Sequence, residues 1–299
     1  MRKWFIALMA MLGTLPFTLN AKTISVQSVQ GIETLPVKPS RIAVFDLGAL
    51  DTVSVLGGEV VALPKATALP PYLTKFNDEH YLDVGSLKEP NFEKLNEAEP
   101  DLNIISARQA RLEARFDEIA PTYFSGIDMQ NFYPSFQQNV RNIAAILDQK
   151  PLAESKLLLL DKQMQAIKQK TKSKTALLLL VNESKLSTYG QDSRFGLLFQ
   201  GYGFTPVDND IKAATHGMSV SFEYVLAHNP DYIFVIDRTA AITEKKDNAK
   251  KVLDNDIIRR TQAYQHGRIV YLDPANWYLA MGGLQAMQMM NDEIEAALK

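Results

Sequence analysis

Two arginines occupy equivalent places in an internal sequence repeat, and their side chains could bind an anion together. Residues 91–105 (NFEKLNEAEPDLNII) align with residues 221–235 (SFEYVLAHNPDYIFV) at an offset of 130 residues without a gap. Arg108 and Arg238 each follow the Pro-Asp pair of their copy by the same distance. A guanidinium group pairs with charged oxygens through a planar set of donors and also stacks on aromatic rings. The repeat therefore predicts one anion-binding cation from each half of the chain.

Each copy of the repeat has the pattern of a short helix, a Pro-Asp turn and a buried strand. Asn91 and Ser221 suit the N-cap position, where their side chains can accept a hydrogen bond from the first helical turn. Pro100 and Pro230 end the helices, because proline lacks the backbone N–H and disfavours a helical residue before it. A repeat of this length predicts two lobes of similar design.

Both arginines come just after the strand of their copy, and ligands of open α/β sheets bind beyond the carboxyl ends of the strands. We therefore expect Arg108 and Arg238 to face a cleft between the lobes. Surface arginines are common, and Arg111 or Arg115 could replace Arg108 in this role. Arg108 is preferred because it follows its strand most closely.

Other side chains could take part in binding or docking, although each also has an ordinary structural explanation. His216 lies in a loop (AATHGM), and most loop histidines are simply solvated. Tyr278 is next to Trp277, and an aromatic pair is more often part of a packed core. Glu93 and Glu223 stand at matching places in the repeat, in the first turn of a helix, where an acidic side chain complements the helix dipole. Residue type and spacing leave both explanations open.

Short apolar runs alternate with helical stretches along the chain, which indicates βα units and a mostly parallel sheet. Residues 22–40 are expected to form a polar leader before the first strand. The expected strands are at 41–47, 60–63, 176–182 and 268–271, and the expected helices are at 47–56, 135–147, 152–172, 196–201 and 281–298.

The stretch 152–172 contains neither Gly nor Pro, and at ~1.5 Å per residue such a helix is about 30 Å long. One long helix predicts a stiff connection between two lobes, whereas a Gly/Ser linker would allow large swings. We therefore divide the chain into a signal peptide (1–21), an N-terminal α/β lobe (22–150), an interlobe helix (151–172) and a C-terminal α/β lobe (173–299).

The first 21 residues have the pattern of a secretory signal peptide. Arg2 and Lys3 precede an uncharged apolar run from Trp4 to Leu19, and Ala21 offers a small residue for cleavage. An N-terminal membrane anchor is disfavoured, because the apolar run is only sixteen residues long.

The chain has no cysteine, so we expect no disulfides and no lipid anchor, since a bacterial lipoprotein needs a Cys at its cleavage site. We expect the exported protein in the periplasm. Without residues 1–21, 30 Lys and Arg remain against 34 Asp and Glu, a net charge of −4. That balance disfavours nucleic acid as a partner.

Two βα lobes, a rigid helix, paired Glu and Pro-Asp segments and a signal peptide resemble the class III periplasmic binding proteins of ABC importers for iron chelates and cobalamin. The resemblance covers nearly the whole chain after residue 21. The chain is most similar to the ferric-catecholate siderophore binders of the enterobactin and vibriobactin type. The motifs that carry this likeness are Ser106-Ala107-Arg108-Gln109, Ser193-Arg194-Phe195-Gly196, Thr215-His216-Gly217, Ile236-Asp237-Arg238 and Trp277-Tyr278-Leu279-Ala280.

The resemblance implies roles for five residues of these motifs. It implies that Arg108, Arg194 and Arg238 bind an anionic ferric catecholate in the cleft. Fe(III) prefers anionic oxygen donors in roughly octahedral geometry, and a tetradentate bis-catecholate supplies only four of them. The resemblance implies that His216 and Tyr278 fill the two open positions.

The same resemblance implies that Glu93 and Glu223 dock onto arginines of an inner-membrane ABC permease. It implies a monomeric protein that is no enzyme and has no intrinsic cofactor, with Fe(III) bound only as its siderophore complex. The sequence leaves the natural siderophore open.

Three alternatives remain at this point. A binder of another chelate, such as heme or cobalamin, could use the same fold, although those ligands would not need three arginines. A zinc or manganese binder needs three or four ligand side chains, whereas the four histidines here show no helical pairing. A secreted hydrolase is disfavoured, because the chain lacks a Gly-x-Ser-x-Gly elbow, a His-Glu-x-x-His motif and any Cys.

Overall fold

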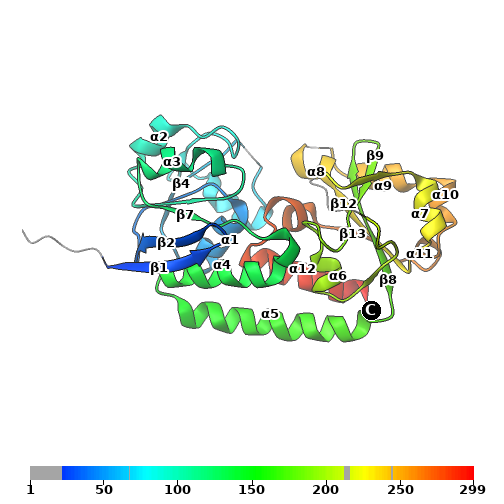
Figure 1. The fold of residues 1–299 in the computed structure, drawn as a ribbon. Coiled ribbons are helices and arrows are strands. Elements are labelled where there is room, and N and C mark those ends of the chain that lie inside the picture. Colours follow the sequence, from blue (N-terminus) through cyan, green and yellow to red (C-terminus); the bar gives the residue numbers. More distant parts are fainter. Residues whose placement is uncertain (1–21, 67, 212–215, 244) are drawn as a thin grey trace, which may run out of the picture.

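Two lobes, each built on its own β-sheet, lie side by side along one long helix (Figure 1). The computed structural model describes residues 22–66, 68–211, 216–243 and 245–299. The expected α/β fold with two sheets and a long connecting helix is confirmed. The signal peptide predicted for residues 1–21 lies outside the described residues. Within those residues, no helix is both long and apolar enough to cross a membrane.

The sheet of the N-terminal lobe is entirely parallel, with the strand order β5-β4-β3-β6-β7. Its strands are β3 (Ile42–Val44), β4 (Val60–Leu63), β5 (Leu82–Asp83), β6 (Leu102–Ile105) and β7 (Thr122–Phe124). The helices of this lobe are α1 (Leu47–Val55), η1 (Pro71–Asn77), α2 (Phe92–Glu97), η2 (Ala110–Leu112), α3 (Glu113–Asp117), η3 (Met129–Asn131) and α4 (Phe132–Ile146).

The second sheet has a parallel centre and an antiparallel edge. Strands β8, β12 and β13 pair in parallel, whereas β9 and β11 continue the sheet in antiparallel pairs and β10 pairs with β8. These strands are β8 (Thr175–Asn182), β9 (Lys185–Thr188), β10 (Thr205–Pro206), β11 (Met218–Val220), β12 (Tyr232–Asp237) and β13 (Ile269–Leu272). The helices around them are α6 (Leu197–Gln200), α7 (Phe222–His228), α8 (Arg238–Ile242), α9 (Asn248–Leu253), α10 (Asp256–Arg259), α11 (Gln262–Gln265) and the π-helical turn η4 (Ala275–Leu279).

The expectation of a polar leader over residues 22–40 is wrong. Strands β1 (Thr23–Ser28) and β2 (Gly31–Pro36) form an antiparallel hairpin that packs on α4. Val26 and Leu35 are buried, because the alternating apolar and polar residues give the hairpin one inward face. The segment therefore belongs to the N-terminal lobe. The alternation of apolar and polar residues was the sequence signal for the hairpin, and the prediction from the overall polarity of the segment missed it.

The predicted helix starts of the repeat are confirmed. Asn91 caps α2 by accepting a hydrogen bond from the backbone N–H of Lys94, and Ser221 caps α7 by accepting one from Tyr224. In both copies the cap side chain accepts from the backbone N–H three residues further along the chain, through an amide oxygen in Asn91 and a hydroxyl oxygen in Ser221.

The aspartates of the repeat also have equivalent partners. Asp101 accepts hydrogen bonds from the backbone N–H groups of Ser40 (2.7 Å) and Arg41 (2.9 Å), just before β3. Asp231 accepts one from the backbone N–H of Thr175 (2.8 Å), at the start of β8. Each copy thus ties its strand to the central strand beside it, and the two lobes share this design.

One buried apolar cluster runs through both lobes. It includes Ile42 and Val44 on one face of β3, Leu178 on one face of β8, and residues such as Leu160 and Met290 on the two helices that join the lobes. The opposite face of each sheet packs into a separate cluster of its own lobe. Because close-packed interiors resist deformation, the shared core couples the lobes mechanically.

Two helices join the lobes where the sequence predicted one. The long helix α5 (Lys150–Thr171) packs on α4, and the last helix, α12 (Leu284–Ala297), packs on both α5 and α1 (Figure 1). The chain therefore returns at its end to the N-terminal lobe. The division at 22–150, 151–172 and 173–299 stays a prediction.

We expect the lobes to move little when a ligand binds, because α5, α12 and the shared core connect them. Small-angle X-ray scattering should record a change in radius of gyration of less than about 1 Å on addition of a saturating ligand. The unliganded protein at equal concentration is the control. A decrease of several ångströms would contradict the stiff connection.

Candidate ligand-binding site

Arg238 stands at the carboxyl end of β12 and contacts two polar groups of its lobe. Its Nε donates to the Tyr278 hydroxyl (2.9 Å), and its Nη1 donates to the Asn182 side-chain oxygen (2.7 Å). Asn182 ends β8, the neighbouring parallel strand. Asp237 fixes the backbone here, because its carboxylate accepts from Ala240 N and caps α8. Arg238 thus lies where the expected strand-end position placed it.

Arg194 also contacts Tyr278. Its guanidinium is 4.8 Å from the centre of the Tyr278 ring and 4.8 Å from that of Phe195, and its Nη2 donates to the Tyr278 backbone oxygen (3.3 Å). Its Nε is buried and has no hydrogen-bond partner among the residues that the structure describes. A buried donor without a partner is costly, so this atom is suited to an incoming acceptor.

Arg108 brings a third positive charge to this group from the other lobe. Burial lowers the pKa of Arg194, and the charge of Arg108 lowers it further, which places Arg108 within electrostatic reach of Arg194. Arg108 itself is exposed in the turn after β6. The buried Gln109 side chain accepts from Ser106 N and donates to the Leu87 backbone oxygen, and it thereby holds this turn.

The two alternatives to Arg108 differ in their surroundings. The Arg115 guanidinium lies 3.9 Å from the centre of the Phe92 ring, against helix α2. Arg111 is exposed on η2. The charge of Arg108 contributes to the lowered pKa of Arg194.

Trp277 and Tyr278 are neighbours in the chain but differ in their surroundings: Trp277 packs in the core, and Tyr278 contacts the arginines. Trp277 is fully buried, and its indole N–H donates to Glu293 on α12 (2.7 Å). Tyr278 is half-buried and points to Arg194 and Arg238. The π-helical turn η4 therefore directs one ring into the core and the other toward the arginines.

His216 is exposed and lies two residues before β11 begins. The next residue, Gly217, has φ of +72°, and a Cβ there would lie 2.7 Å from Cε2 of Tyr189. The loop backbone therefore packs on the Tyr189 ring, one residue from His216. No hydrogen bond joins His216 to Tyr278 in the described part of the chain. The structure brings Tyr278 together with Arg194 and Arg238, and the charge of Arg108 acts on Arg194 from the other lobe.

Sequence reasoning missed Asn182 and Tyr189. Asn182 orients Arg238, and its place at the end of β8 could have suggested it by the same strand-end rule. Tyr189 is buried edge-on against Phe195. Burial raises the pKa of Tyr189, and the charges of Arg194 and Arg238 oppose the effect. No local pattern marks Tyr189, because its contacts with Gly217 and the charge of Arg238 come from segments further along the chain.

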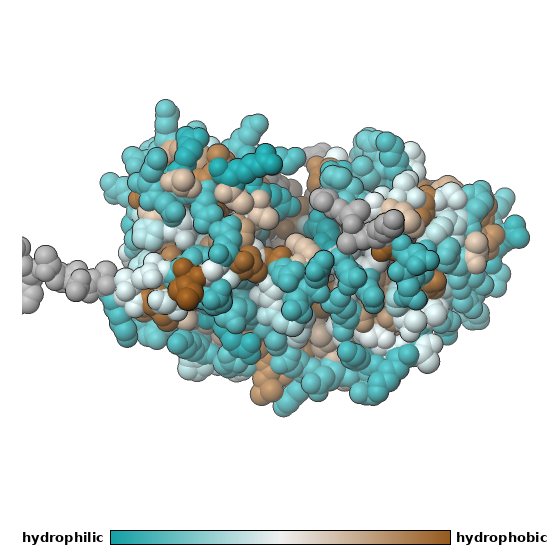
Figure 2. Space-filling model, in the orientation of Figure 1, coloured by the Kyte–Doolittle hydropathy of each residue, from teal (hydrophilic) through white to brown (hydrophobic). Residues whose placement is uncertain are grey.

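The molecule is hollowed between its two lobes in the space-filling view (Figure 2). Within the residues described, no group of three or more His, Cys, Asp or Glu side chains could hold a bare metal ion. Two guanidinium groups against a phenol, with the charge of Arg108 acting on one of them, instead suit an anion, and they suit a metal only when a chelator already supplies most of its ligands.

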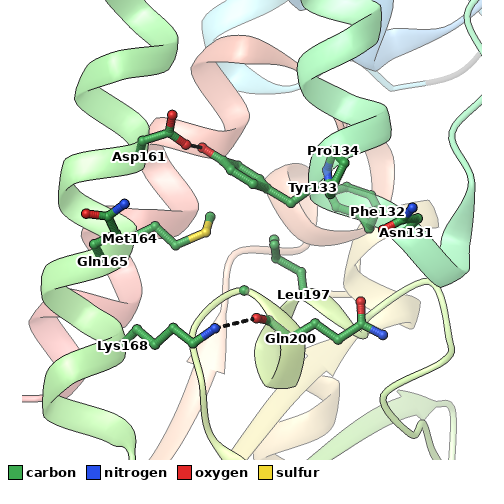
Figure 3. A pocket seen from close by; sticks show the side chains of 11 residues that line it. Asn131, Phe132, Tyr133, Pro134, Asp161, Met164, Gln165, Lys168, Leu197 and Gln200 are labelled. Atoms are coloured by element: carbon green, nitrogen blue, oxygen red, sulfur yellow. Dashed lines mark hydrogen bonds between the residues drawn. The ribbon is translucent and has the colours of Figure 1, made fainter.

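A second cavity is separate from the arginine group. Its volume is about 370 Å³, and it lies between α4, α5 and α6 (Figure 3). Its polar groups largely pair with each other, since the Tyr133 hydroxyl donates to Asp161 (2.7 Å) and the Lys168 ammonium donates to the Gln200 backbone oxygen (3.2 Å). None of the residues predicted for ligand binding lines it.

Glu93 and Glu223 are exposed in the first turns of α2 and α7, on outer parts of the two lobes (Figure 1). Hydrogen bonds at the helix start lower the pKa of the Glu223 carboxyl, so it is ionised at neutral pH. Neither carboxylate is needed to cap its helix, because Asn91 and Ser221 do so.

Comparison with known proteins gives a consistent result. The model of the family described as "periplasmic binding protein" matches residues 42–275. The petrobactin-binding protein YclQ of Bacillus subtilis is 42% identical over 269 residues, which are 89% of this chain and 84% of YclQ. The ferric-anguibactin-binding protein FatB of Vibrio anguillarum is 28% identical, over 86% of this chain and 82% of FatB.

Solved structures agree in fold over nearly the whole chain. The crystal structure of YclQ matches with a TM-score of 0.88 and 40% identity, covering 93% of this chain and 99% of the other. The periplasmic catecholate-siderophore binding protein VctP of Vibrio cholerae matches with a TM-score of 0.88 and 33% identity, covering 92% and 100% of the two chains.

Proposed function

Because this chain belongs to the periplasmic binding protein family, we propose that it captures a ferric catecholate siderophore and delivers it to an inner-membrane ABC permease. The single observation that carries this proposal is the group formed by Arg108, Arg194, Arg238 and Tyr278 between the two lobes. The relatives are named for petrobactin, ferric anguibactin and catecholate siderophores, which supports a siderophore as the class of ligand.

The chemistry of the arginine group fits an anionic iron chelate. The guanidinium groups neutralise the chelate charge, and the unpartnered Nε of Arg194 offers a donor to a catecholate oxygen. Arginine also stacks on a flat ring, as Arg194 does on Tyr278, so it can stack on a catechol.

His216 and Tyr278 then complete the iron coordination of a tetradentate bis-catecholate. Tyr278 would bind as phenolate, because the charge of Fe(III) favours the ionised form. Arg238 would release the Tyr278 hydroxyl, to which it now donates, and turn to the chelate. His216 would bind as neutral imidazole from its exposed position beside Gly217.

Delivery to the importer follows from the same family membership. We propose that the chain is exported to the periplasm with cleavage after Ala21, remains free of a lipid anchor, and works as a monomer. Glu93 and Glu223, one on each lobe, would contact arginines of the permease. Fe(III) is cargo in this function, and no resident cofactor and no catalytic step is involved.

A fluorescence titration tests the ligand class. Trp4 and Trp277 are the two tryptophans, so after cleavage the emission comes from Trp277, next to Tyr278. We expect saturable quenching by a ferric bis-catecholate and none by the iron-free chelator. Heme and cobalamin are included in the same panel. If heme or cobalamin quenches the emission saturably and the ferric bis-catecholate does not, the ligand is of another class and the catecholate proposal fails.

A further inference from the structure

The start of α12 is held by a carboxylate from the other lobe. The Asp51 side chain, on α1, accepts hydrogen bonds from the backbone N–H groups of Gln285 (3.0 Å) and Ala286 (2.8 Å). The neighbouring Thr52 hydroxyl accepts one from Leu284 N (3.2 Å). Since the first N–H groups of a helix have no partner within it, α12 takes its cap from residues more than 230 positions earlier in the chain.

Glycines permit this close approach. The N-cap residue of α12 is Gly283, which has no capping side chain, and a Cβ there would lie 2.2 Å from the Asp51 carboxylate. Gly282 has φ of +94°, and a Cβ on it would lie 2.4 Å from Ile127 of the N-terminal lobe. A Cβ on Gly48 would lie 3.0 Å from the Met281 backbone oxygen. The turn before α12 is therefore embedded in the N-terminal lobe.

Continuous hydrogen bonding links this turn to Tyr278. Ala280 N donates to Ala275 O (2.9 Å) across η4, and Gly283 N donates to Ala280 O (3.0 Å). The Glu293 carboxylate, on α12, accepts from Asp273 N (2.8 Å) and from the Trp277 indole. Residues 273–283 and α12 thus form one body, which carries Tyr278 at one end and rests on Asp51 at the other.

We propose that Asp51 is a positioning residue of the siderophore site: from the N-terminal lobe it fixes the start of α12, and so the placement of Tyr278 against the arginines. This inference deepens the proposed function and rests on it. Asp51 is not part of the arginine group and makes no hydrogen bond to any of its members among the described residues. It acts through the backbone of residues 280–286.

The surroundings of Asp51 give this role a dependence on pH. The titratable group that contacts it is Tyr72, whose hydroxyl donates to the carboxylate (3.3 Å), and the charge of Asp273 acts on Tyr72 in turn. Its own helix, α1, has no other charged residue, and the first turn of α12 has none. Burial raises the pKa of Asp51 to about 6, whereas the backbone N–H groups lower it. Above pH 6 the ionised carboxylate accepts the hydrogen bonds of both backbone N–H groups. Below pH 6 a proton on one carboxyl oxygen weakens its ability to accept them.

Protonation of Asp51 is expected to affect the free energy of unfolding and the ligand affinity in opposite directions. As the pH falls through about 6, folded Asp51 takes up a proton that the unfolded chain binds only at lower pH. The contribution of Asp51 to the free energy of unfolding therefore rises as the pH falls toward 4. The hold on α12 weakens over the same range, so ligand affinity should fall while this contribution to stability grows.

The test compares the wild type with Asp51→Asn, an isosteric change that mimics the protonated acid. At pH 8 we expect Asp51→Asn to bind a ferric bis-catecholate about tenfold more weakly, because a buried N–H loses a charged acceptor. At pH 5 the two proteins should bind alike, because Asp51 is then protonated. Any effect of pH on the chelate itself is common to both proteins and cancels in the ratio of their affinities. Equal affinity of the two proteins at pH 8 overturns the proposal.

A second measurement needs no ligand. In Asp51→Asn at pH 8, the amides of residues 280–286 should exchange hydrogen about tenfold faster than in the wild type, with β8 and β12 unchanged. Thr52→Val, which removes the acceptor of one N–H, should act in the same direction with a smaller effect. Asp101→Asn is the matched control, since Asp101 also accepts from backbone N–H groups but lies away from α12.

These measurements separate the two proposals. A wild type that binds no ferric catecholate contradicts the proposed function, and the exchange result still decides whether Asp51 holds residues 280–286. Unchanged exchange in both Asp51→Asn and Thr52→Val contradicts the positioning role even when the wild type binds its ligand.

Discussion

The charge-transfer band of a bound ferric bis-catecholate should shift when His216 is replaced by Ala and Tyr278 by Phe in the same protein. Loss of the Tyr278 phenolate and the His216 imidazole changes the donors of the iron, and water or buffer takes their places. Affinity should fall by at least about tenfold, since a contact to a charged group is worth about 1.5–3 kcal/mol. Visible absorption and a fluorescence titration measure the two effects.

A hexadentate triscatecholate gives the internal control for this prediction. It supplies six oxygens, so its band should be the same in the wild type and in the double variant. Tyr133→Phe is the matched protein control. It also removes a tyrosine hydroxyl, but that hydroxyl binds Asp161 in the separate cavity and is not part of the arginine group. An unchanged bis-catecholate spectrum in the double variant would show that neither residue binds the iron.

Uptake should be abolished or strongly reduced when Glu93 and Glu223 are both replaced by Ala, with ligand affinity unchanged. Both carboxylates are exposed on the outer parts of their lobes, and neither takes part in the arginine group. A contact between opposite charges speeds association and sets the orientation of the partners. Transport of radioactive iron into cells, or into vesicles that contain the permease, measures the effect, and a fluorescence titration measures affinity.

The control for this prediction must remove the same charge elsewhere. Glu97→Ala with Glu118→Ala removes two exposed acidic residues of the N-terminal lobe, one of them on α2 itself. We expect near-normal uptake from this variant. If the Glu93 and Glu223 double variant transports iron as well as the wild type, the two residues do not dock the protein to the permease.

Local patterns predicted a large part of the fold and two of the arginines. The caps of α2 and α7, the Pro-Asp turns and the strands β6 and β12 follow from residue types that act within a few positions. Arg108 and Arg238 could be placed from the repeat because the carboxyl ends of parallel strands meet at one edge of a sheet. Arg194, His216 and Tyr278 were found by resemblance to a family, since their own segments carry no such pattern.

The hairpin β1–β2 shows how a local pattern can be present and still be missed. Its residues alternate between buried and exposed positions, but the segment is polar enough to resemble a leader. What makes it a hairpin is an inward face that packs on α4, together with the bond from the Asn142 side chain to the Gln27 backbone oxygen. These partners lie more than 100 residues away, beyond the range of a local pattern.

The amino-acid sequence determined that the chain has two similar halves, a stiff helix between them, and one arginine of each half beyond the end of a strand. These features depend on backbone preferences and on apolar periodicity, which operate over a few residues. The tertiary structure decided that Tyr278 lies between Arg194 and Arg238 and that Asn182 orients one of them. It also decided that Asp51 holds α12 from the opposite lobe. Those contacts join residues up to 235 positions apart, and they form only when the shared core brings the two lobes together.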